Sequence, residues 1–204
     1  MAILVGKNAP DFQAKAVLKN TIIENFTLSQ FRGKYVVLFF YPLDFTFVCP
    51  TELHAFNDAL QDIKSRNAEL IGCSVDSCYA HQAWLDMPRS KGGIEGLEYP
   101  LISDINKTIT SDYGVLHPDG IAYRGLFLID RQGVVRHQLV NDLPLGRSVS
   151  EAVRMLDALQ AFENQGEVCP ANWHKGEKGM VPTHEGLEKY IAATLPTSKK
   201  AALV

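Results

Sequence analysis

Hydrophobic residues follow two different periods along the chain. Residues 35–41 are continuously apolar and rich in β-branched and aromatic side chains, which predicts a strand buried on both faces. Residues 68–75 and 122–130 predict further strands, and residues 101–104 predict a short one. Residues 134–140 alternate more between apolar and polar positions, as is typical of a strand nearer the edge of a sheet.

Near the start of the chain, residues 11–26 predict two short strands in a hairpin-like arrangement around Lys19 and Asn20. Between the later strands, apolar residues recur at every third or fourth position, which predicts amphipathic helices. We expect these helices over residues 49–66, 78–87, 105–113 and 153–162. Because strands and helices alternate about a few very apolar strands, the sequence predicts an α/β domain with a central sheet.

The character of the sequence changes after about Gly166. Residues 166–204 lack a long periodic apolar face, and we expect them to form an extended C-terminal arm, not a second domain. The sequence therefore divides into a domain at residues 1–165 and an arm at residues 166–204.

Composition limits the possible functions. The chain has 204 residues, of which 46% are hydrophobic and 21% charged, a balance typical of a globular protein. A formal net charge of -3 gives no basic surface for nucleic acid or an anionic membrane. No apolar stretch approaches the roughly 20 residues that span a bilayer, and no signal-peptide pattern is present. We expect a cytoplasmic protein.

The four cysteines are Cys49, Cys73, Cys78 and Cys169. This number does not make a disulfide scaffold in a chain of this length, and the spacing does not match a zinc site. For Cys73, inside an apolar strand, and Cys78, at the front of a helix, we favour a structural role in a buried position. Cys169 lies in the arm, where burial is not an obvious reason for a cysteine, and a role as partner thiol remains open.

Cys49 differs because it stands where a helix is expected to begin, after a buried strand that ends at Pro42. The positive end of a helix dipole lowers the pKa of a thiol, so Cys49 is a candidate nucleophile. The Thr46 hydroxyl could bond the thiolate or an oxygen substrate, and Pro42 with the loop phenylalanines would exclude water. Glu52 would oppose the thiolate unless it is paired with an arginine.

Two stretches resemble a known family. Residues 40–52, FYPLDFTFVCPTE, resemble the peroxidatic motif of the typical 2-Cys peroxiredoxins, the AhpC and thiol-specific antioxidant family. Residues 166–173, GEVCPANW, resemble the resolving-cysteine motif of the same family. The resemblance extends from about residue 3 to about residue 190. It implies a thioredoxin fold, with a mixed central β-sheet flanked by helices, and a C-terminal arm.

The resemblance also implies a thiol-dependent peroxidase that uses no metal and no cofactor. The Cys49 thiolate would attack the O–O bond of hydrogen peroxide or an organic hydroperoxide and become a sulfenic acid. Cys169 of a neighbouring subunit would condense with it to form an intersubunit disulfide.

The same resemblance assigns the residues around the sulfur. Pro42 and Thr46 would shape the pocket, and Arg124 would stabilise the thiolate and hold the peroxide. Glu52 would position the arginine. Without the resemblance, Arg124 would be interpreted as a surface charge at the end of a strand.

As partners, the resemblance implies a second copy in a disulfide-linked homodimer, a decamer of five dimers, and thioredoxin or a flavoprotein disulfide reductase. No nucleic acid or membrane is expected. A chaperone or peroxide-sensing assembly is the alternative from another class of protein. A disulfide oxidoreductase like thioredoxin is disfavoured because Cys49 has no Cys-x-x-Cys partner.

Overall fold

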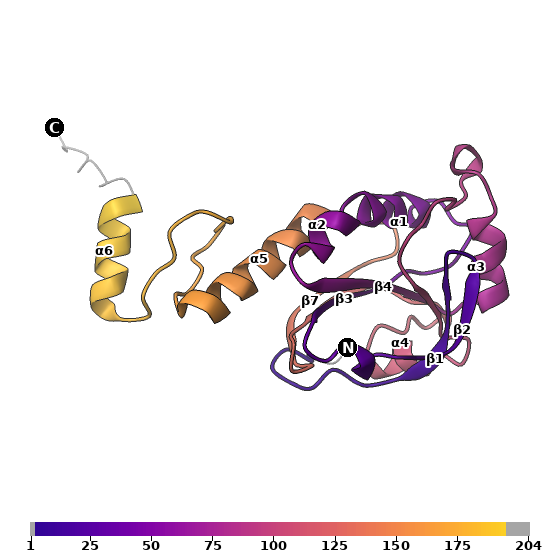
Figure 1. Ribbon diagram of the computed structural model, residues 1–204, viewed down its shortest axis with the longest axis horizontal. Helices are drawn as coiled ribbons and strands as arrows, with labels where there is room; N and C mark the ends of the chain where they lie inside the picture. Colours follow the sequence, from indigo (N-terminus) through magenta and orange to yellow (C-terminus); the bar gives the residue numbers. More distant parts are fainter. Residues whose placement is uncertain (1–2, 195–204) are drawn as a thin grey trace. The chain divides into compact units, whose positions relative to one another are not determined.

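The computed structural model describes residues 3–194 (Figure 1). The chain forms two compact units, one extending to Val153 and the other beginning at Arg154. The first unit is built on a seven-stranded sheet in the order β2-β1-β5-β4-β3-β6-β7. Its strands are β1 Gln13–Leu18, β2 Thr21–Thr27, β3 Tyr35–Phe40, β4 Ala68–Ser74, β5 Leu101–Ser103, β6 Arg124–Ile129 and β7 Val135–Asn141.

The sheet is mixed. Strand β4 runs parallel to β3 and to β5, while β6 is antiparallel to both β3 and β7. The central strands β3 and β6 are buried at every residue, as their continuously apolar sequences predict. Strand β7 lies at the edge, which its more alternating pattern predicts. The predicted α/β fold with a mixed central sheet is confirmed.

The predicted hairpin at the start of the chain is also present. Strands β1 and β2 are antiparallel, with Leu18 opposite Thr21. The two residues between them, Lys19 and Asn20, have φ of 47° and 64°. Two consecutive left-handed residues are typical of the tight turns that match the twist of a hairpin.

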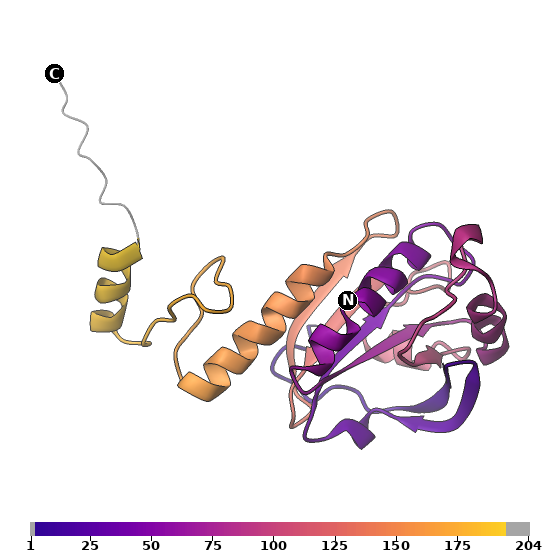
Figure 2. The same ribbon diagram turned by 45° about the horizontal axis from the view of Figure 1, so that its top comes forward.

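Helices cover both faces of the sheet in the first unit (Figure 1). Helices α1 Cys49–Asp58 and α2 Leu60–Lys64 lie on one face, and α4 Thr108–Asp112 lies on the other. With that first face brought forward, α1 and α2 lie across the strands (Figure 2). On the opposite side of β3, the Phe40 ring packs against Tyr113 and Phe127, with ring centroids 5.2 Å and 5.8 Å away.

Two predicted helices have different limits in the structure. The helix expected over residues 49–66 is interrupted at Ala59, whose N–H is shared between the carbonyls of Ala55 and Asn57. The helix expected over residues 105–113 begins only at Thr108, as α4. The carboxylate of Asp104 accepts the N–H groups of Ile109 and Thr110, at 3.1 Å and 2.7 Å, and so caps the helix from a point outside it.

Two further helices each begin after a serine that caps them. Helix α3, Cys78–Leu85, begins after Ser77, whose hydroxyl accepts the Ala80 N–H at 3.1 Å. Helix α5, Val149–Gln165, begins four residues before the predicted start at residue 153. The Ser148 hydroxyl accepts the Glu151 N–H at 3.3 Å, which places the cap one residue before the helix.

The second unit contains a helix that the sequence analysis missed. Helix α6, His184–Thr194, lies within the stretch expected to be an arm without a long amphipathic helix. Its apolar residues Leu187 and Ile191 are four apart, a helical spacing, but the stretch is too short to indicate a long amphipathic helix. The two side chains are 39% and 43% exposed. The division of the chain at residues 165 and 166 stays a prediction. No helix among residues 3–194 combines the length and apolar character needed to cross a membrane.

Candidate active site

The Cys49 thiol lies at the start of α1. Cys49 is the first residue of this helix and is completely buried, and Pro50 follows in the first turn, where a missing N–H has no cost. All four cysteines are free thiols. Cys73 and Cys78 are also buried, as expected, while their structural role stays a prediction. Burial raises the pKa of Cys73 well above its ordinary value.

Arg124 faces the Cys49 sulfur from the neighbouring strand β6. The guanidinium Nη1 lies 3.5 Å from Cys49 Sγ and also donates to Glu52 Oε2 at 2.6 Å. Because Nη1 carries two N–H bonds, it can direct one to each acceptor. The Arg124 Nε–H donates to the Leu143 carbonyl at 2.7 Å, which fixes the plane of the guanidinium. Arg124 is 3% exposed, so it is not a surface charge at the end of a strand.

Glu52 lies one turn after Cys49 on α1 and is paired with two arginines. Its Oε1 accepts both the Nε–H and the backbone N–H of Arg147 at 2.8 Å, while Oε2 accepts from Arg124. Burial favours a higher pKa for Glu52, but the charge and hydrogen bonds of Arg147, with help from Arg124, hold this pKa below its ordinary value. Two guanidinium groups against one carboxylate leave an excess positive charge beside the thiol.

Arg147 is a site residue that the sequence analysis did not find. It is 8% exposed, and its Nη1 donates to the carbonyls of Phe40 and Gly125 at 2.7 Å and 2.6 Å. These bonds tie the loop before α5 to the ends of β3 and β6. Its only sequence signal was that Glu52 would oppose the thiolate unless it is paired with an arginine, and this did not point to Arg147.

The loop between β3 and α1 carries Pro42 and Thr46. Pro42 is buried. The Thr46 hydroxyl donates to the Leu43 carbonyl at 2.8 Å, so its proton is not directed at the thiolate, and its lone pairs are left to accept from a substrate. The expectation that the loop phenylalanines exclude water is wrong: Phe45 and Phe47 are 53% and 92% exposed. Phe45 has a φ of 57°, and its ring lies against an aromatic residue of α3 instead.

A buried polar network holds this loop to the sheet. The Tyr41 hydroxyl donates to Asp44 Oδ1 at 2.8 Å, and His81 Nδ1 lies 2.7 Å from Asp44 Oδ2. The Asp44 N–H donates to Asp76 Oδ2 at 2.9 Å. Burial raises the pKa of Asp76, and the nearby Asp44 carboxylate raises it further. No local sequence pattern predicts this network, since its residues come from the loop after β3, the turn after β4 and helix α3.

Cys169 belongs to the second unit. Its thiol is half-buried and donates to the Ala158 carbonyl at 3.4 Å. Burial raises the pKa of Cys169, although Arg154 acts in the opposite direction. The structure thus brings together Cys49, Glu52 and Arg124, whereas Cys169 is described only within its own unit.

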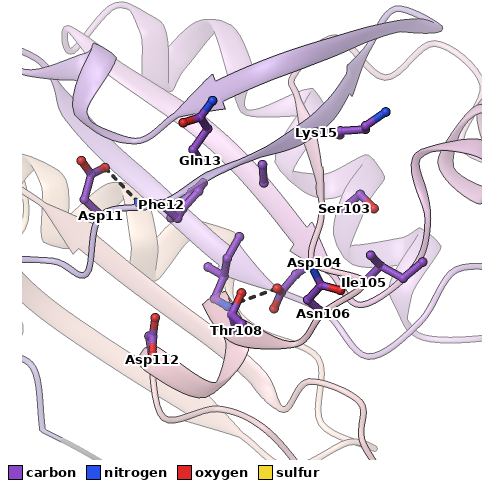
Figure 3. A pocket seen from close by; sticks show the side chains of 12 residues that line it. Asp11, Phe12, Gln13, Lys15, Ser103, Asp104, Ile105, Asn106, Thr108 and Asp112 are labelled. Atoms are coloured by element: carbon purple, nitrogen blue, oxygen red, sulfur yellow. Dashed lines mark hydrogen bonds between the residues drawn. The ribbon is translucent and has the colours of Figure 1, made fainter.

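A hollow of about 380 Å³ lies elsewhere in the first unit and contains none of the predicted site residues (Figure 3). It is lined by residues of β1, of the segment before it, and of the segment from β5 to α4. Asp11, at its rim, is occupied in accepting the Phe12 N–H at 3.0 Å. Among residues 3–194, no group of three or more His, Cys, Asp or Glu side chains is arranged to hold a metal ion.

Comparison with known proteins gives consistent matches over most of the chain. Residues 5–138 match the AhpC/TSA family, and residues 158–192 match the C-terminal domain of 1-Cys peroxiredoxin. A thioredoxin peroxidase of Echinococcus granulosus is 50% identical over 194 residues, covering 95% of this chain and 100% of that protein. Peroxiredoxin-2 of Mus musculus is 51% identical over 189 residues, covering 92% and 95%. The reduced 2-Cys peroxiredoxin of Plasmodium vivax has a TM-score of 0.91 and 51% identity, covering 94% and 100%.

Proposed function

The chain belongs to the AhpC/TSA family, as a typical 2-Cys peroxiredoxin with a thioredoxin fold, and on this premise we propose that it reduces peroxides through Cys49. The family supports a thiol-dependent peroxidase, an oxidoreductase, acting on hydrogen peroxide and organic hydroperoxides. The observation that carries the assignment to Cys49 is the buried contact between its sulfur and Arg124 Nη1 at 3.5 Å, with Glu52 holding the same nitrogen.

In the first step the Cys49 thiolate attacks one oxygen of the peroxide. The S–O bond forms as the O–O bond breaks, the sulfur is oxidised to a sulfenic acid, and the leaving oxygen takes a proton to become water or an alcohol. Arg124 has fixed N–H donors beside the sulfur, where negative charge shifts from sulfur to the leaving oxygen. Thr46 can accept a hydrogen bond from the substrate hydroxyl and so orient it. Pro42, which is buried at the start of the same loop, would shape the pocket, as in the family.

In the second step we propose that the Cys169 thiol of a second copy attacks the sulfenic acid. The S–S bond forms, the S–O bond breaks and water leaves, which gives an intersubunit disulfide. Two sulfurs must come within about 2.05 Å of each other, so the buried Cys49 has to be exposed by opening of the first turn of α1. The half-buried state of Cys169 suits an attacking thiol.

The outer edge of the sheet supports assembly into a dimer. Strand β7 is the last strand in the sheet order, and the N-terminal segment engages its backbone at the start of the strand, where Val135 exchanges backbone hydrogen bonds with Gly6 and Lys7. The outer edge of a last strand can pair with the same edge of a second copy. A decamer of five such dimers remains a prediction. Thioredoxin is the proposed reductant of the disulfide, supported by the name of the Echinococcus relative, with a flavoprotein disulfide reductase as the alternative. A secondary chaperone or peroxide-sensing role and a cytoplasmic location also remain predictions.

The proposal is tested by peroxide consumption with thioredoxin, thioredoxin reductase and NADPH. Cys49→Ser should abolish turnover, and Cys169→Ser should stop after one equivalent of peroxide per subunit. On a non-reducing gel, the peroxide-treated wild type should run as a dimer and both variants as monomers. Cys73→Ser, which changes a buried thiol away from the site, should keep the dimer. Turnover by Cys49→Ser would overturn the assignment.

A further inference from the structure

Asn141 lies directly across the sheet from Arg124. It is the last residue of β7, and the antiparallel register of β6 and β7 pairs it with Arg124, the first residue of β6. The Asn141 Nδ2 donates to the carbonyls of Leu145 and Gly146, at 3.1 Å and 3.4 Å. Because both neighbours are acceptors, only the NH2 side of the amide can face them, which fixes the orientation of the side chain.

These two hydrogen bonds close the loop formed by residues 142–147. Within the loop, the Leu145 N–H donates to the Asp142 carbonyl at 3.1 Å, which makes a tight turn. The Asn141 amide fastens the far side of this turn back to the end of β7. Hydrogen bonds from residues 141 and 142 to residues 145 and 146 therefore hold the two ends of the loop together, although most of its residues are exposed.

The loop held in this way contacts Arg124 and ends at Arg147, the second arginine of the site. Its Leu143 carbonyl accepts the Arg124 Nε–H at 2.7 Å. Its backbone N–H at Arg147 donates to Glu52 Oε1 at 2.8 Å. A guanidinium is planar, so a bond at Nε determines where the two terminal nitrogens point. Displacement of the Leu143 carbonyl would rotate Nη1 away from the Cys49 sulfur.

We propose that Asn141 is a positioning residue for the peroxide reaction: its amide holds the loop 142–147 in the shape that directs Arg124 at the Cys49 sulfur and Arg147 at Glu52. This inference rests on the proposed function of Cys49. Asn141 touches neither sulfur nor substrate in this role and acts through the Leu143 carbonyl and Arg124. Small errors in the position of such a group are costly to the rate because the reacting atoms must be aligned.

The test uses two substitutions and one control. Asn141→Ala removes both donors, and Asn141→Asp keeps the shape but places carboxylate oxygens against the two carbonyl oxygens. Asn106→Asp adds the same charge in the separate hollow of Figure 3 and should react like the wild type. We expect the second-order rate constant of Cys49 with hydrogen peroxide to fall roughly 3- to 10-fold in Asn141→Ala and further in Asn141→Asp.

Alkylation of Cys49 by iodoacetamide separates positioning from general loosening. Iodoacetamide reacts with the same thiolate but needs no arginine to hold an oxygen. At a pH high enough to ionise Cys49 in every variant, its rate should therefore change less than twofold while the peroxide rate falls. A double-mutant cycle then asks whether Asn141 acts through Arg124. In an Arg124→Lys background, Asn141→Ala should cause no further loss.

Three results would overturn the inference. They are an unchanged peroxide rate in Asn141→Ala, an equal loss of rate with peroxide and with iodoacetamide, or a double mutant with Arg124→Lys whose loss equals the product of the two single losses. Failure of the proposed function gives a different result, because the wild type itself would then show no fast reaction of Cys49 with peroxide.

Discussion

Replacement of Glu52 by glutamine tests how the buried charges of the site are balanced. Glu52 is 3% exposed and accepts four hydrogen bonds, from Arg124 Nη1, from Arg147 Nε and Nη2, and from the Arg147 backbone. Glutamine keeps the size and shape of the side chain. It removes the only negative charge among these contacts, and its own NH2 group would face guanidinium N–H groups.

The expected loss of stability is large because both arginines stay buried. The Arg124 and Arg147 side chains are 4% and 1% exposed, so water cannot replace the carboxylate. Removing one partner of a buried ion pair costs about 3–5 kcal/mol. At neutral pH, the free energy of unfolding should fall by an amount in this range, which changes the folding equilibrium constant by roughly two to four powers of ten.

The measurement is urea denaturation followed by tryptophan fluorescence in a Trp173→Phe background, which leaves Trp84, completely buried in the first unit, as the reporter. Glu69→Gln is the matched control. Glu69 pairs with Lys34 at 2.6 Å, but both side chains are solvent-accessible, so the same substitution there should cost at most about 1 kcal/mol. A loss for Glu52→Gln no larger than that of the control would refute the account of the charge balance.

The pH dependence gives the same prediction a second test. The pKa of Glu52 in the folded protein lies below its ordinary value of 4.5. A carboxyl of this kind adds stability above its unfolded pKa and loses it as the pH falls through the lower folded pKa. The difference in stability between wild type and Glu52→Gln should therefore be complete at neutral pH and should shrink below about pH 4.5. If the difference in stability between the two proteins stays constant down to strong acid, the Glu52 carboxylate is not its source.

Three further predictions concern the loops and the second thiol. Thr46→Val removes the hydroxyl oxygen that can accept from a substrate and should lower the rate of Cys49 with hydrogen peroxide roughly tenfold, with little change in the rate of alkylation. A peroxide rate equal to that of the wild type would exclude Thr46 from substrate orientation. Gly93→Ala would place a methyl group 1.9 Å from the Met87 carbonyl oxygen and should destabilise the protein by about 1–3 kcal/mol in urea denaturation; an unchanged midpoint would contradict this close contact. Since burial raises the pKa of Cys169, disulfide formation after oxidation, followed by stopped-flow fluorescence, should accelerate as the pH rises above neutral. A rate that does not change with pH would show that deprotonation of Cys169 is not limiting.

The strands could be predicted because burial on both faces leaves an unbroken apolar signal. Residues 35–41 predict β3 to within one residue at its end. Helix limits were less accurate because they depend on single side chains. The start of α4 is set by the Asp104 carboxylate, and the helical spacing of Leu187 and Ile191 in α6 is confined to one segment of 11 residues.

The site was only partly predictable for a different reason. Cys49, Thr46 and Glu52 lie close together in the sequence, so their chemistry forms a local motif. Arg147 is separated from Glu52 by 95 residues, and only the fold brings the two together. The proposed role of Asn141 is still harder to predict from the sequence, because it depends on the loop shape and on the register of two strands. Neither a composition nor a local pattern carries information of this kind.

In the proposed mechanism, peroxide oxidises Cys49 first and Cys169 then joins it in a disulfide. The most direct measurement is peptide mass spectrometry after treatment of the reduced protein with one equivalent of hydrogen peroxide. In Cys169→Ser with dimedone present, the adduct should be on the peptide of Cys49, with Cys73 and Cys78 unmodified. In the wild type, the Cys49 and Cys169 peptides should be linked by a disulfide. Dimedone on Cys73 or Cys78 in place of Cys49, or a wild-type disulfide that lacks Cys49, would contradict the mechanism.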